Sequence, residues 1–171
     1  MNVKRIVLGS LKENCYILEK NNKLLIIDPG ADFFKIEREV HKEVEAVIIT
    51  HGHYDHIGAL QEVIKRYGCK EYGFSDLEEK HYEFGPFSFS IIYTQGHTDD
   101  SITVYFEDEK MMFAGDFIFK NGIGRWDLPT GNFDKLKKSI EKISSYPDYV
   151  KVFTGHGDET TIGEFKMWVD S

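Results

Sequence analysis

Four side chains of metal-binding type lie within six residues of the segment Ile49–Gly58, which reads ITHGHYDHIG. Such a segment is either a histidine-rich loop in solvent or half of a metal site. His51 and His53 follow a strand and can point the same way, whereas one helix face would need a spacing of three or four residues. Asp55 and His56 begin the next helix, so we expect them to point elsewhere. One ion would not easily take all four side chains from so tight a turn, and the segment therefore indicates two neighbouring ions.

An apolar strand that ends in threonine and leads into histidine occurs three times in the chain. The three places are Thr50-His51, Thr94-Gln95-Gly96-His97 and Thr154-Gly155-His156, and with His53 and His56, which closely follow His51, they account for five of the seven histidines. A fourth strand end carries Asp116 after a glycine. Because α/β proteins commonly keep their sites at strand ends, we expect these side chains to meet at one edge of a sheet. The two other histidines, His41 and His81, are expected on helices at the surface.

The composition is that of one packed domain over residues 1–171, since 41% of the residues are hydrophobic and 14% are aromatic. A net charge of −8 without a basic stripe argues against nucleic acid as a partner. No signal peptide and no apolar run long enough to span a membrane is present, which predicts a cytoplasmic protein without a membrane partner. Cys15 and Cys69 stand apart from any CxxC pair and are expected to be reduced core thiols. The oligomeric state is left open.

Apolar periodicity predicts strands that alternate with helices, which is an α/β arrangement of sheets covered by helices. The predicted strands are Val3–Leu8, Cys15–Glu19, Lys23–Ile27, Ala46–Ile49, Phe87–Thr94, Ile102–Phe106, Met111–Ala114 and Val150–Phe153. The predicted helices are Phe33–Lys42 with Asp32 as its N-cap, Ile57–Tyr67 ending at Gly68, one that begins after the cap residue Asn132, and Ile162–Val169.

The motif H-x-H-x-D-H, followed by a distant histidine, an aspartate at a strand end and a late histidine, resembles the metallo-β-lactamase superfamily. The resemblance runs from NCYIL (Asn14–Leu18) and DPG (Asp28–Gly30) to GHGDETTIGE (Gly155–Glu164). It implies a four-layer αββα sandwich of two similar halves with the metal site at one edge. It also implies one ion held by His51, His53 and His97, a second held by Asp55, His56 and His156, and Asp116 bridging both.

Two divalent ions lower the pKa of a shared water towards neutrality and polarise a substrate carbonyl, so a hydroxide can attack without a serine or cysteine nucleophile. His53 and Asp55 are the residues that we expect activity to depend on. Zinc is the expected metal, and iron or manganese would suit the same ligands. The positive ions favour an anionic acyl compound as the small-molecule substrate.

Two further segments indicate which branch of the superfamily the chain resembles. GDFIFKNGIGRWDLPTGN (Gly115–Asn132) and FTGHGDETTIGEF (Phe153–Phe165) look like the small glyoxalase II-type hydrolases, which cleave thioesters. Persulfide dioxygenases, with one iron, have a related GR-x-D segment and form the first alternative. A metal-stabilised binding module without catalytic activity is the second. The glyoxalase II enzymes carry a C-terminal helical domain for glutathione, and no such domain fits this chain.

Several residues near the motifs have two interpretations. In GHTDDS (Gly96–Ser101), Asp99 and Asp100 stand where the family usually has Pro and Gly. They form a plain polar turn, or one of them accepts a hydrogen bond that orients His97. Arg125 and Asp127 form an ion pair, or Arg125 meets a substrate carboxylate. The aromatic residues Tyr54, Phe119 and Trp126 line the pocket or pack as core.

Overall fold

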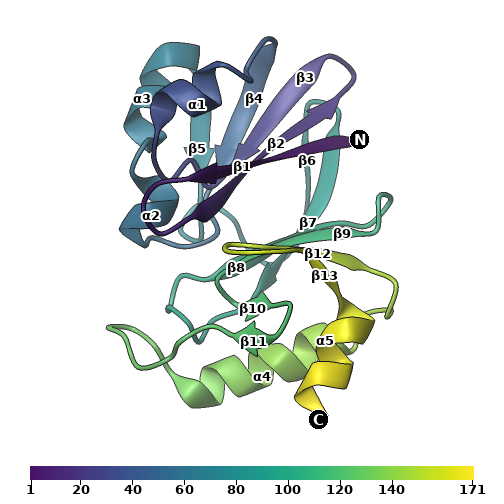
Figure 1. Cartoon of the computed structure of the whole chain (residues 1–171). Helices are drawn as coiled ribbons and strands as arrows, with labels where there is room; N and C mark the ends of the chain where they lie inside the picture. The colour runs from purple at the N-terminus through teal and green to yellow at the C-terminus, as the bar shows by residue number, and fades with distance from the viewer.

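The computed structural model describes all 171 residues, Met1–Ser171. Two sheets pack face to face, and helices cover the outer face of each sheet (Figure 1). Three hydrophobic clusters separate these layers: one between the two sheets, one beneath the N-terminal helices and one beneath the C-terminal helices. The predicted αββα sandwich is therefore confirmed. None of the helices has the length and apolar character needed to cross a bilayer.

The first sheet has the strand order β1-β2-β3-β4-β5. Its strands are β1 (Asn2–Leu8), β2 (Glu13–Lys20), β3 (Lys23–Ile27), β4 (Glu43–Ile48) and β5 (Lys70–Tyr72). The hairpins β1–β2 and β2–β3 are antiparallel, whereas β3, β4 and β5 run parallel. The outer face is covered by α1 (Phe33–Glu37), α2 (Tyr54–Ile57) and α3 (Leu60–Tyr67).

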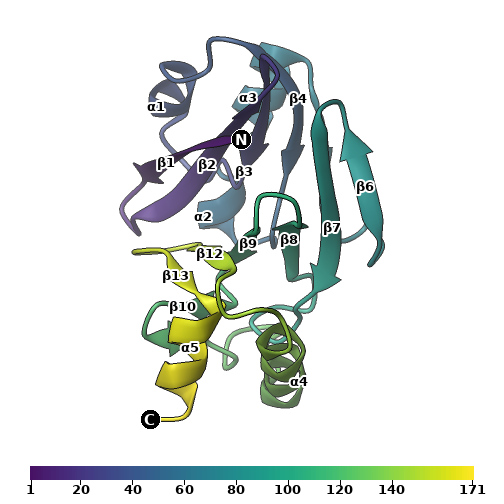
Figure 2. The same cartoon turned by 90° about the vertical axis from the view of Figure 1, so that its right-hand side faces the viewer.

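The second sheet has the strand order β13-β12-β9-β8-β7-β6. Its strands are β6 (His81–Phe84), β7 (Phe87–Tyr93), β8 (Ile102–Phe106), β9 (Met111–Gly115), β12 (Lys151–Thr154) and β13 (Thr160–Thr161). Only β9 and β12 are parallel. A small hairpin, β10 (Ile118–Phe119) with β11 (Gly122–Ile123), lies apart from it. The helices α4 (Phe133–Ser144) and α5 (Ile162–Val169) cover the outer face, as the rotated view shows (Figure 2).

The central strands are apolar on both faces because both faces are buried. In β2, Tyr16 and Leu18 point into the core between the sheets, whereas Cys15 and Ile17 point towards the helices. The thiols of Cys15 and Cys69 are free and buried, as expected. Asn132 accepts a hydrogen bond from the backbone of Lys135 and caps α4, also as expected.

The helix predicted over Phe33–Lys42 ends at Glu37, and Asp32 occupies its N-cap position as expected, although its side chain makes no capping hydrogen bond. The Asp32 carboxylate instead accepts hydrogen bonds from the Gly9 backbone and from Lys35, and the chain after Glu37 unwinds through bonds between residues three apart. His41 consequently lies outside the helix, although it is exposed as expected. His81 is also exposed, but it lies in β6 rather than in a helix.

The helix predicted over Ile57–Tyr67 is broken between α2 and α3. The Ala59 backbone N–H donates to the Pro29 carbonyl, 3.0 Å away, instead of continuing the helix. Gly68 ends α3 in the left-handed conformation, as expected. The break leaves α2 as a separate short helix, and this is the helix that carries Asp55 and His56.

Candidate metal centre

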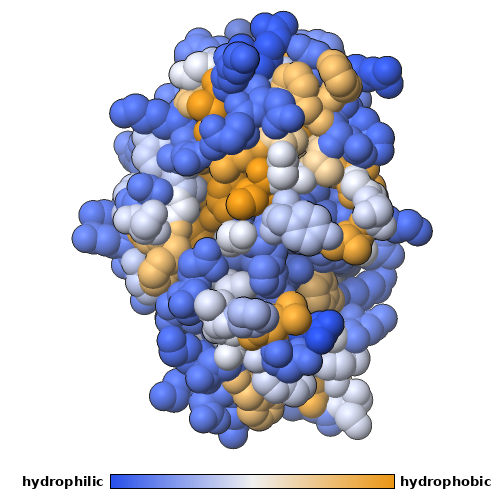
Figure 3. All heavy atoms as spheres, turned by 90° about the vertical axis from the view of Figure 1, so that its left-hand side faces the viewer, coloured by the Kyte–Doolittle hydropathy of each residue, from blue (hydrophilic) through white to orange (hydrophobic).

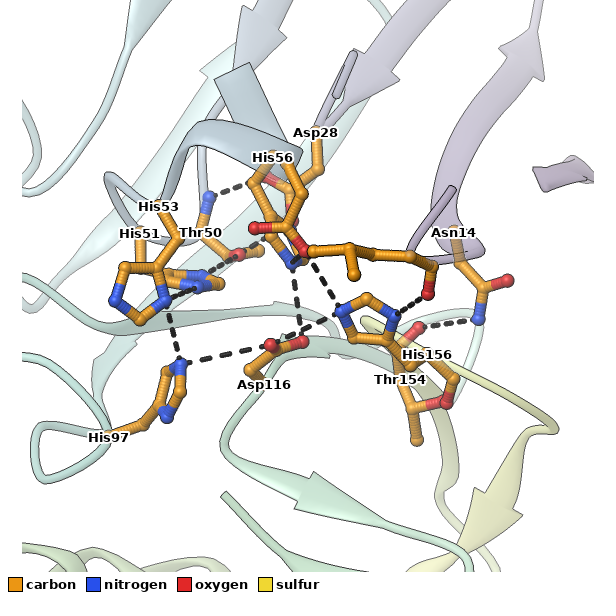
Figure 4. A network of polar contacts seen from close by, with 12 residues as sticks. Asn14, Asp28, Thr50, His51, His53, His56, His97, Asp116, Thr154 and His156 are labelled. Atoms are coloured by element: carbon orange, nitrogen blue, oxygen red, sulfur yellow. Dashed lines mark hydrogen bonds and ion pairs between the residues drawn. The ribbon is translucent and has the colours of Figure 1, made fainter. Parts of the chain in front are cut away.

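All seven side chains that the sequence proposes as ligands meet in one place, where the two sheets end beside each other (Figure 4). They follow the ends of strands in both sheets or lie in α2: His51 and His53 after β4, Asp55 and His56 in α2, His97 after β7, Asp116 after β9, and His156 after β12. The expectation that they meet at the edge of a single sheet is therefore wrong. The edge belongs to the sandwich, and each sheet supplies part of the set. That these residues bind metal stays a prediction.

The first ligand group consists of His51, His53 and His97. The Nδ1 atom of His53 lies 3.1 Å from Nε2 of His51 and 3.0 Å from Nε2 of His97. Nitrogen ligands at 2.0–2.1 Å from a tetrahedral ion lie about 3.3 Å from one another. Three imidazole nitrogens so close together are therefore arranged as an ion requires.

The second ligand group consists of Asp55, His56 and His156. Nε2 of His156 lies 3.2 Å from Asp55 Oδ2, and Nε2 of His56 lies 3.9 Å from the same oxygen. Asp116 stands between the two groups. Its Oδ1 lies 3.3 Å from His56, while its Oδ2 lies 3.4 Å from His156 and 3.7 Å from His97.

Two buried atoms at this place lack a hydrogen-bond partner, namely Nε2 of His56 and Oδ1 of Asp116. Leaving a buried polar atom unsatisfied is costly, so native proteins rarely do so without a reason. Imidazole nitrogen and carboxylate oxygen are also the donors that zinc, iron and manganese accept. The residues present therefore fit a pair of divalent ions, and the clusters are able to hold metal.

A buried carboxylate that the sequence analysis did not assign, Asp28, orients the histidines. Its Oδ2 accepts hydrogen bonds from His56 Nδ1 at 2.8 Å and from Thr50 Oγ1 at 2.6 Å, and its Oδ1 accepts one from the Thr50 backbone at 2.7 Å. The Thr50 hydroxyl in turn lies 3.1 Å from His51 Nδ1. Asp28 itself lies close enough to His51 and His56 to be a ligand. Because its oxygens already accept three hydrogen bonds, we assign it an orienting role. In the sequence, Asp28 could have been identified as a candidate because it is an acid directly after the apolar run LLII.

Backbone carbonyls orient two further rings. His97 Nδ1 donates to the Arg125 carbonyl at 2.7 Å, and His156 Nδ1 donates to the Leu11 carbonyl at 3.0 Å. Each bond leaves Nε2 of the ring free to face the site. The hypothesis that Asp99 orients His97 is therefore wrong. The Asp99 carbonyl accepts a hydrogen bond from the Gln95 side chain, which is the polar-turn alternative.

Glycine is required at position 155 by the packing of the site. A Cβ atom there would lie 2.0 Å from Asp116 Oδ1 and 2.8 Å from His56 Cε1. Gly155 therefore lets β12 approach both groups closely enough for His156 to reach them.

The pKa shifts differ between the two ligand groups. Burial lowers the pKa of His51 and of His97, so both rings are neutral at pH 7. Burial would also lower the pKa of His56, but Asp28 and Asp116 outweigh it and the net shift is upward. The hydrogen bond from His156 to Asp116 raises the pKa of His156.

Ion binding at the second group is expected to weaken first as the pH falls. Its two histidines have raised pKa values and must give up protons to bind an ion, whereas His51 and His97 are already neutral. Each displaced proton makes the apparent affinity fall by about tenfold per pH unit below the histidine pKa. Metal analysis of protein dialysed between pH 8 and pH 5 should show the ratio of bound metal to protein falling from two through one. Simultaneous loss of both ions would contradict this order.

The site opens into a cavity of about 430 Å³. Its wall combines ligands from both groups with Leu11, Tyr54, Phe119, Ile123, Gly124, Arg125 and Leu128. Trp126 does not line the cavity and packs on Phe133, with ring centroids 5.0 Å apart. The expected ion pair is present, since the Arg125 guanidinium donates two hydrogen bonds to Asp127, at 2.9 and 3.0 Å.

A second hollow of about 260 Å³ lies behind His51, beside α2, α3 and β5. Its apolar lining comes from Ile49, Ile57, Leu60, Tyr72 and Phe74, and its acidic lining from Glu71, Asp76 and Asp100. The face of the molecule that carries α3 shows apolar surface recessed among charged side chains (Figure 3). Since the ligand atoms of His51 face the other ligands, this hollow is not the mouth of the metal site.

Comparison with known sequences agrees with this geometry. The family model described as the metallo-beta-lactamase superfamily matches residues 8–87 and 73–156. The probable metallo-hydrolase YqgX of Bacillus subtilis is 30% identical over 95% of this chain and 93% of its own. The hydroxyacylglutathione hydrolase GloC of Haemophilus influenzae is 29% identical over 97% of this chain and 95% of its own.

Solved structures agree as well. The B3 metallo-beta-lactamase BLEG-1 has a TM-score of 0.88 at 30% identity, covering 95% of each chain. The protein TTHA1623, solved in a di-iron-bound form, has a TM-score of 0.86 at 26% identity, covering 94% of this chain and 96% of its own. ETHE1 from Myxococcus xanthus has a TM-score of 0.86 at 25% identity, covering 97% of this chain and 82% of its own. The resemblance stated from the motifs is thus confirmed, and the protein belongs to the metallo-β-lactamase superfamily.

Proposed function

We propose that the protein is a hydrolase that uses two divalent metal ions to cleave a thioester or a related acyl compound. The observation that carries the proposal is the pairing of two ligand groups across one carboxylate, Asp116, at the floor of a largely apolar cavity. The likeness to GloC supports the thioester class, and the di-iron-bound TTHA1623 supports two ions.

A pair of divalent ions, when bound, supplies a water of lowered pKa and an electrophile for the substrate carbonyl. Asp116 and the two ligand groups hold the reacting region at the cavity floor. Hydrolysis adds water across the acyl–sulfur bond, so the acyl carbon gains a hydroxyl and the sulfur leaves as a thiol. Asp55 and His53 both line the cavity, where the attacking water gives up its proton.

The residues that line the cavity favour a particular class of substrate. Leu11, Phe119, Ile123 and Leu128 offer apolar contact for a hydrocarbon part of the acyl or thiol group. Arg125 is the only lysine or arginine in the lining, and its ion pair with Asp127 is exposed to solvent, so the guanidinium can exchange this partner for a substrate carboxylate. We therefore propose a small acyl compound with one anionic group, bound with Arg125 at the rim.

The test is a substrate panel assayed with metal-free protein and with protein reloaded with zinc, iron(II) or manganese. The panel contains S-lactoylglutathione, an acyl-coenzyme A, an acyl homoserine lactone and a β-lactam. We expect thioester cleavage that disappears on chelation and returns with metal, because the cavity lining holds no serine, threonine, cysteine or lysine that could attack in place of the metal-activated water.

Two outcomes would contradict the proposal. One is protein that holds two ions yet cleaves no thioester. The other is oxygen uptake with glutathione persulfide by protein that holds one iron, which would establish the dioxygenase alternative.

A further inference from the structure

Glu13, the first residue of β2, is a buried acid without any hydrogen-bond partner. Its side chain is 1% exposed, and neither carboxylate oxygen has a partner. Asp28, the other acid among the buried residues, accepts three hydrogen bonds instead. Burying an unpaired carboxyl group costs stability, so its presence calls for a structural reason. Glu13 does not line the cavity, so it does not touch substrate.

The Glu13 side chain lies beside the segment that carries Asp55 and His56, two of the three residues of the second ligand group. A Cβ atom on Gly30 would lie 2.4 Å from Glu13 Oε2 and 1.6 Å from the Asp55 carbonyl oxygen. The carboxyl group and the Asp55 backbone therefore press against the same face of Gly30. A Cβ atom on Gly58, just after α2, would in turn lie 2.3 Å from the carbonyl oxygen of Gly30. The helix that carries Asp55 and His56 is thus packed directly on Glu13 and Gly30.

The Glu13 backbone contacts the segment that carries His156, the third residue of the same group. Glu13 pairs with His156 in an isolated antiparallel bridge. The next residue, Asn14, donates its backbone N–H to the Gly155 carbonyl at 2.7 Å and its side-chain amide to the Thr154 carbonyl at 3.0 Å. One residue therefore contacts both segments that supply the second group, through its side chain on one side and its backbone on the other.

We propose that Glu13 is a positioning residue for the second metal ion, because its carboxyl group fixes α2 relative to the loop of His156. No hydrogen bond or strand pairing joins Glu13 to the turn after β4 or to the loop after β7, which supply the first ligand group. Loss of the Glu13 carboxyl group therefore affects one ion and spares the other. This inference rests on the two-ion part of the proposed function and is independent of the substrate.

The experiment is a zinc titration of metal-free protein against a chromophoric chelator, which resolves two dissociation constants. In Glu13→Gln we expect the ion of the second ligand group to lose about 10- to 100-fold in affinity, as is usual when a residue behind the ligands is replaced. The other dissociation constant should stay at the wild-type value. Absorption spectra of the cobalt-loaded variant should change only in the bands that belong to cobalt in the second ligand group.

Glu109→Gln is the matched control, because Glu109 also has a buried oxygen without a partner but pairs with Lys20 away from the site. It should leave both dissociation constants unchanged. If Glu13→Gln folds poorly, Glu13→Asp keeps a carboxyl group but withdraws it from Gly30, and the same selective loss is expected.

Three results would overturn the inference. Wild-type affinity at both sites of Glu13→Gln would show that the carboxyl group positions nothing, and equal weakening at both sites would show a general loss of structure. A wild-type protein that binds one ion only would refute the two-ion proposal itself, which separates that failure from a failure specific to Glu13.

Discussion

Replacing Asp116 by asparagine is expected to lower the rate of thioester hydrolysis by about 10³-fold or more, because a metal pair contributes several kcal/mol to the transition state and each 1.36 kcal/mol is tenfold. The Asp116 carboxylate faces both ligand groups, with one oxygen near His56 and the other near His156 and His97. An amide has one oxygen and no charge, so it cannot bridge two ions. The close approach of His156 and His56 outweighs burial and holds the pKa of Asp116 below its usual range, so the group that the variant removes is an anion.

The measurement is kcat and KM for the best thioester of the panel, together with the ratio of bound metal to protein. Asp148→Asn is the control, because Asp148 is an exposed acid paired with Lys166 and far from the site in the fold. It should keep wild-type kcat. An Asp116→Asn enzyme with two ions and more than a tenth of the wild-type kcat would exclude a bridging role.

Replacing Phe113 by alanine is expected to reduce the free energy of unfolding by about 3–5 kcal/mol. Phe113 lies in β9 and is 1% exposed between the two sheets. Its ring stacks on Phe153 with centroids 4.7 Å apart, and it meets the edge of Tyr16 at 5.2 Å. The loss is a large part of the roughly 5–15 kcal/mol that stabilises a typical domain.

Urea unfolding of metal-free protein measures this change without the added stability of bound ions. Phe34→Ala serves as the control, since Phe34 is 74% exposed and its replacement should change the unfolding free energy by less than about 0.5 kcal/mol. An equal loss in both variants would mean that the stacked aromatic cluster does not hold the sheets together. Because Asp116 directly follows β9, weaker metal binding should accompany the Phe113 change.

The sequence was informative where one local pattern decides the outcome. The apolar run of β3 and the alternation of apolar residues in β8 predicted both strands at their observed bounds, although the alternation indicated a half-buried strand and every residue of β8 is buried. The cap residue Asn132 and the stop at Gly68 were equally clear. The spacing of His51, His53, Asp55 and His56 indicated two directions of ligation, and the structure places them in two groups.

Prediction failed where distant contacts compete with local preference. The break after α2 arises because Ala59 bonds to Pro29, and nothing in the helical periodicity of that segment encodes this bond. The short strands β5, β6 and β13 exist because they pair with longer neighbours. Asp99 is beside His97 in sequence, yet the ring bonds to the carbonyl of Arg125, which is remote in sequence.

The sequence by itself determined which chemical groups are available and that strand ends carry them, because residue type and apolar period are properties of short segments. Only the tertiary structure decided which nitrogen of each imidazole faces the site, that Asp28 and Thr50 orient the rings, and that Glu13 lies beneath α2. These outcomes depend on hydrogen bonds and close contacts between segments up to about 140 residues apart, such as the bridge from Glu13 to His156. Such contacts form only when the two sheets pack and bring their strand ends to one edge.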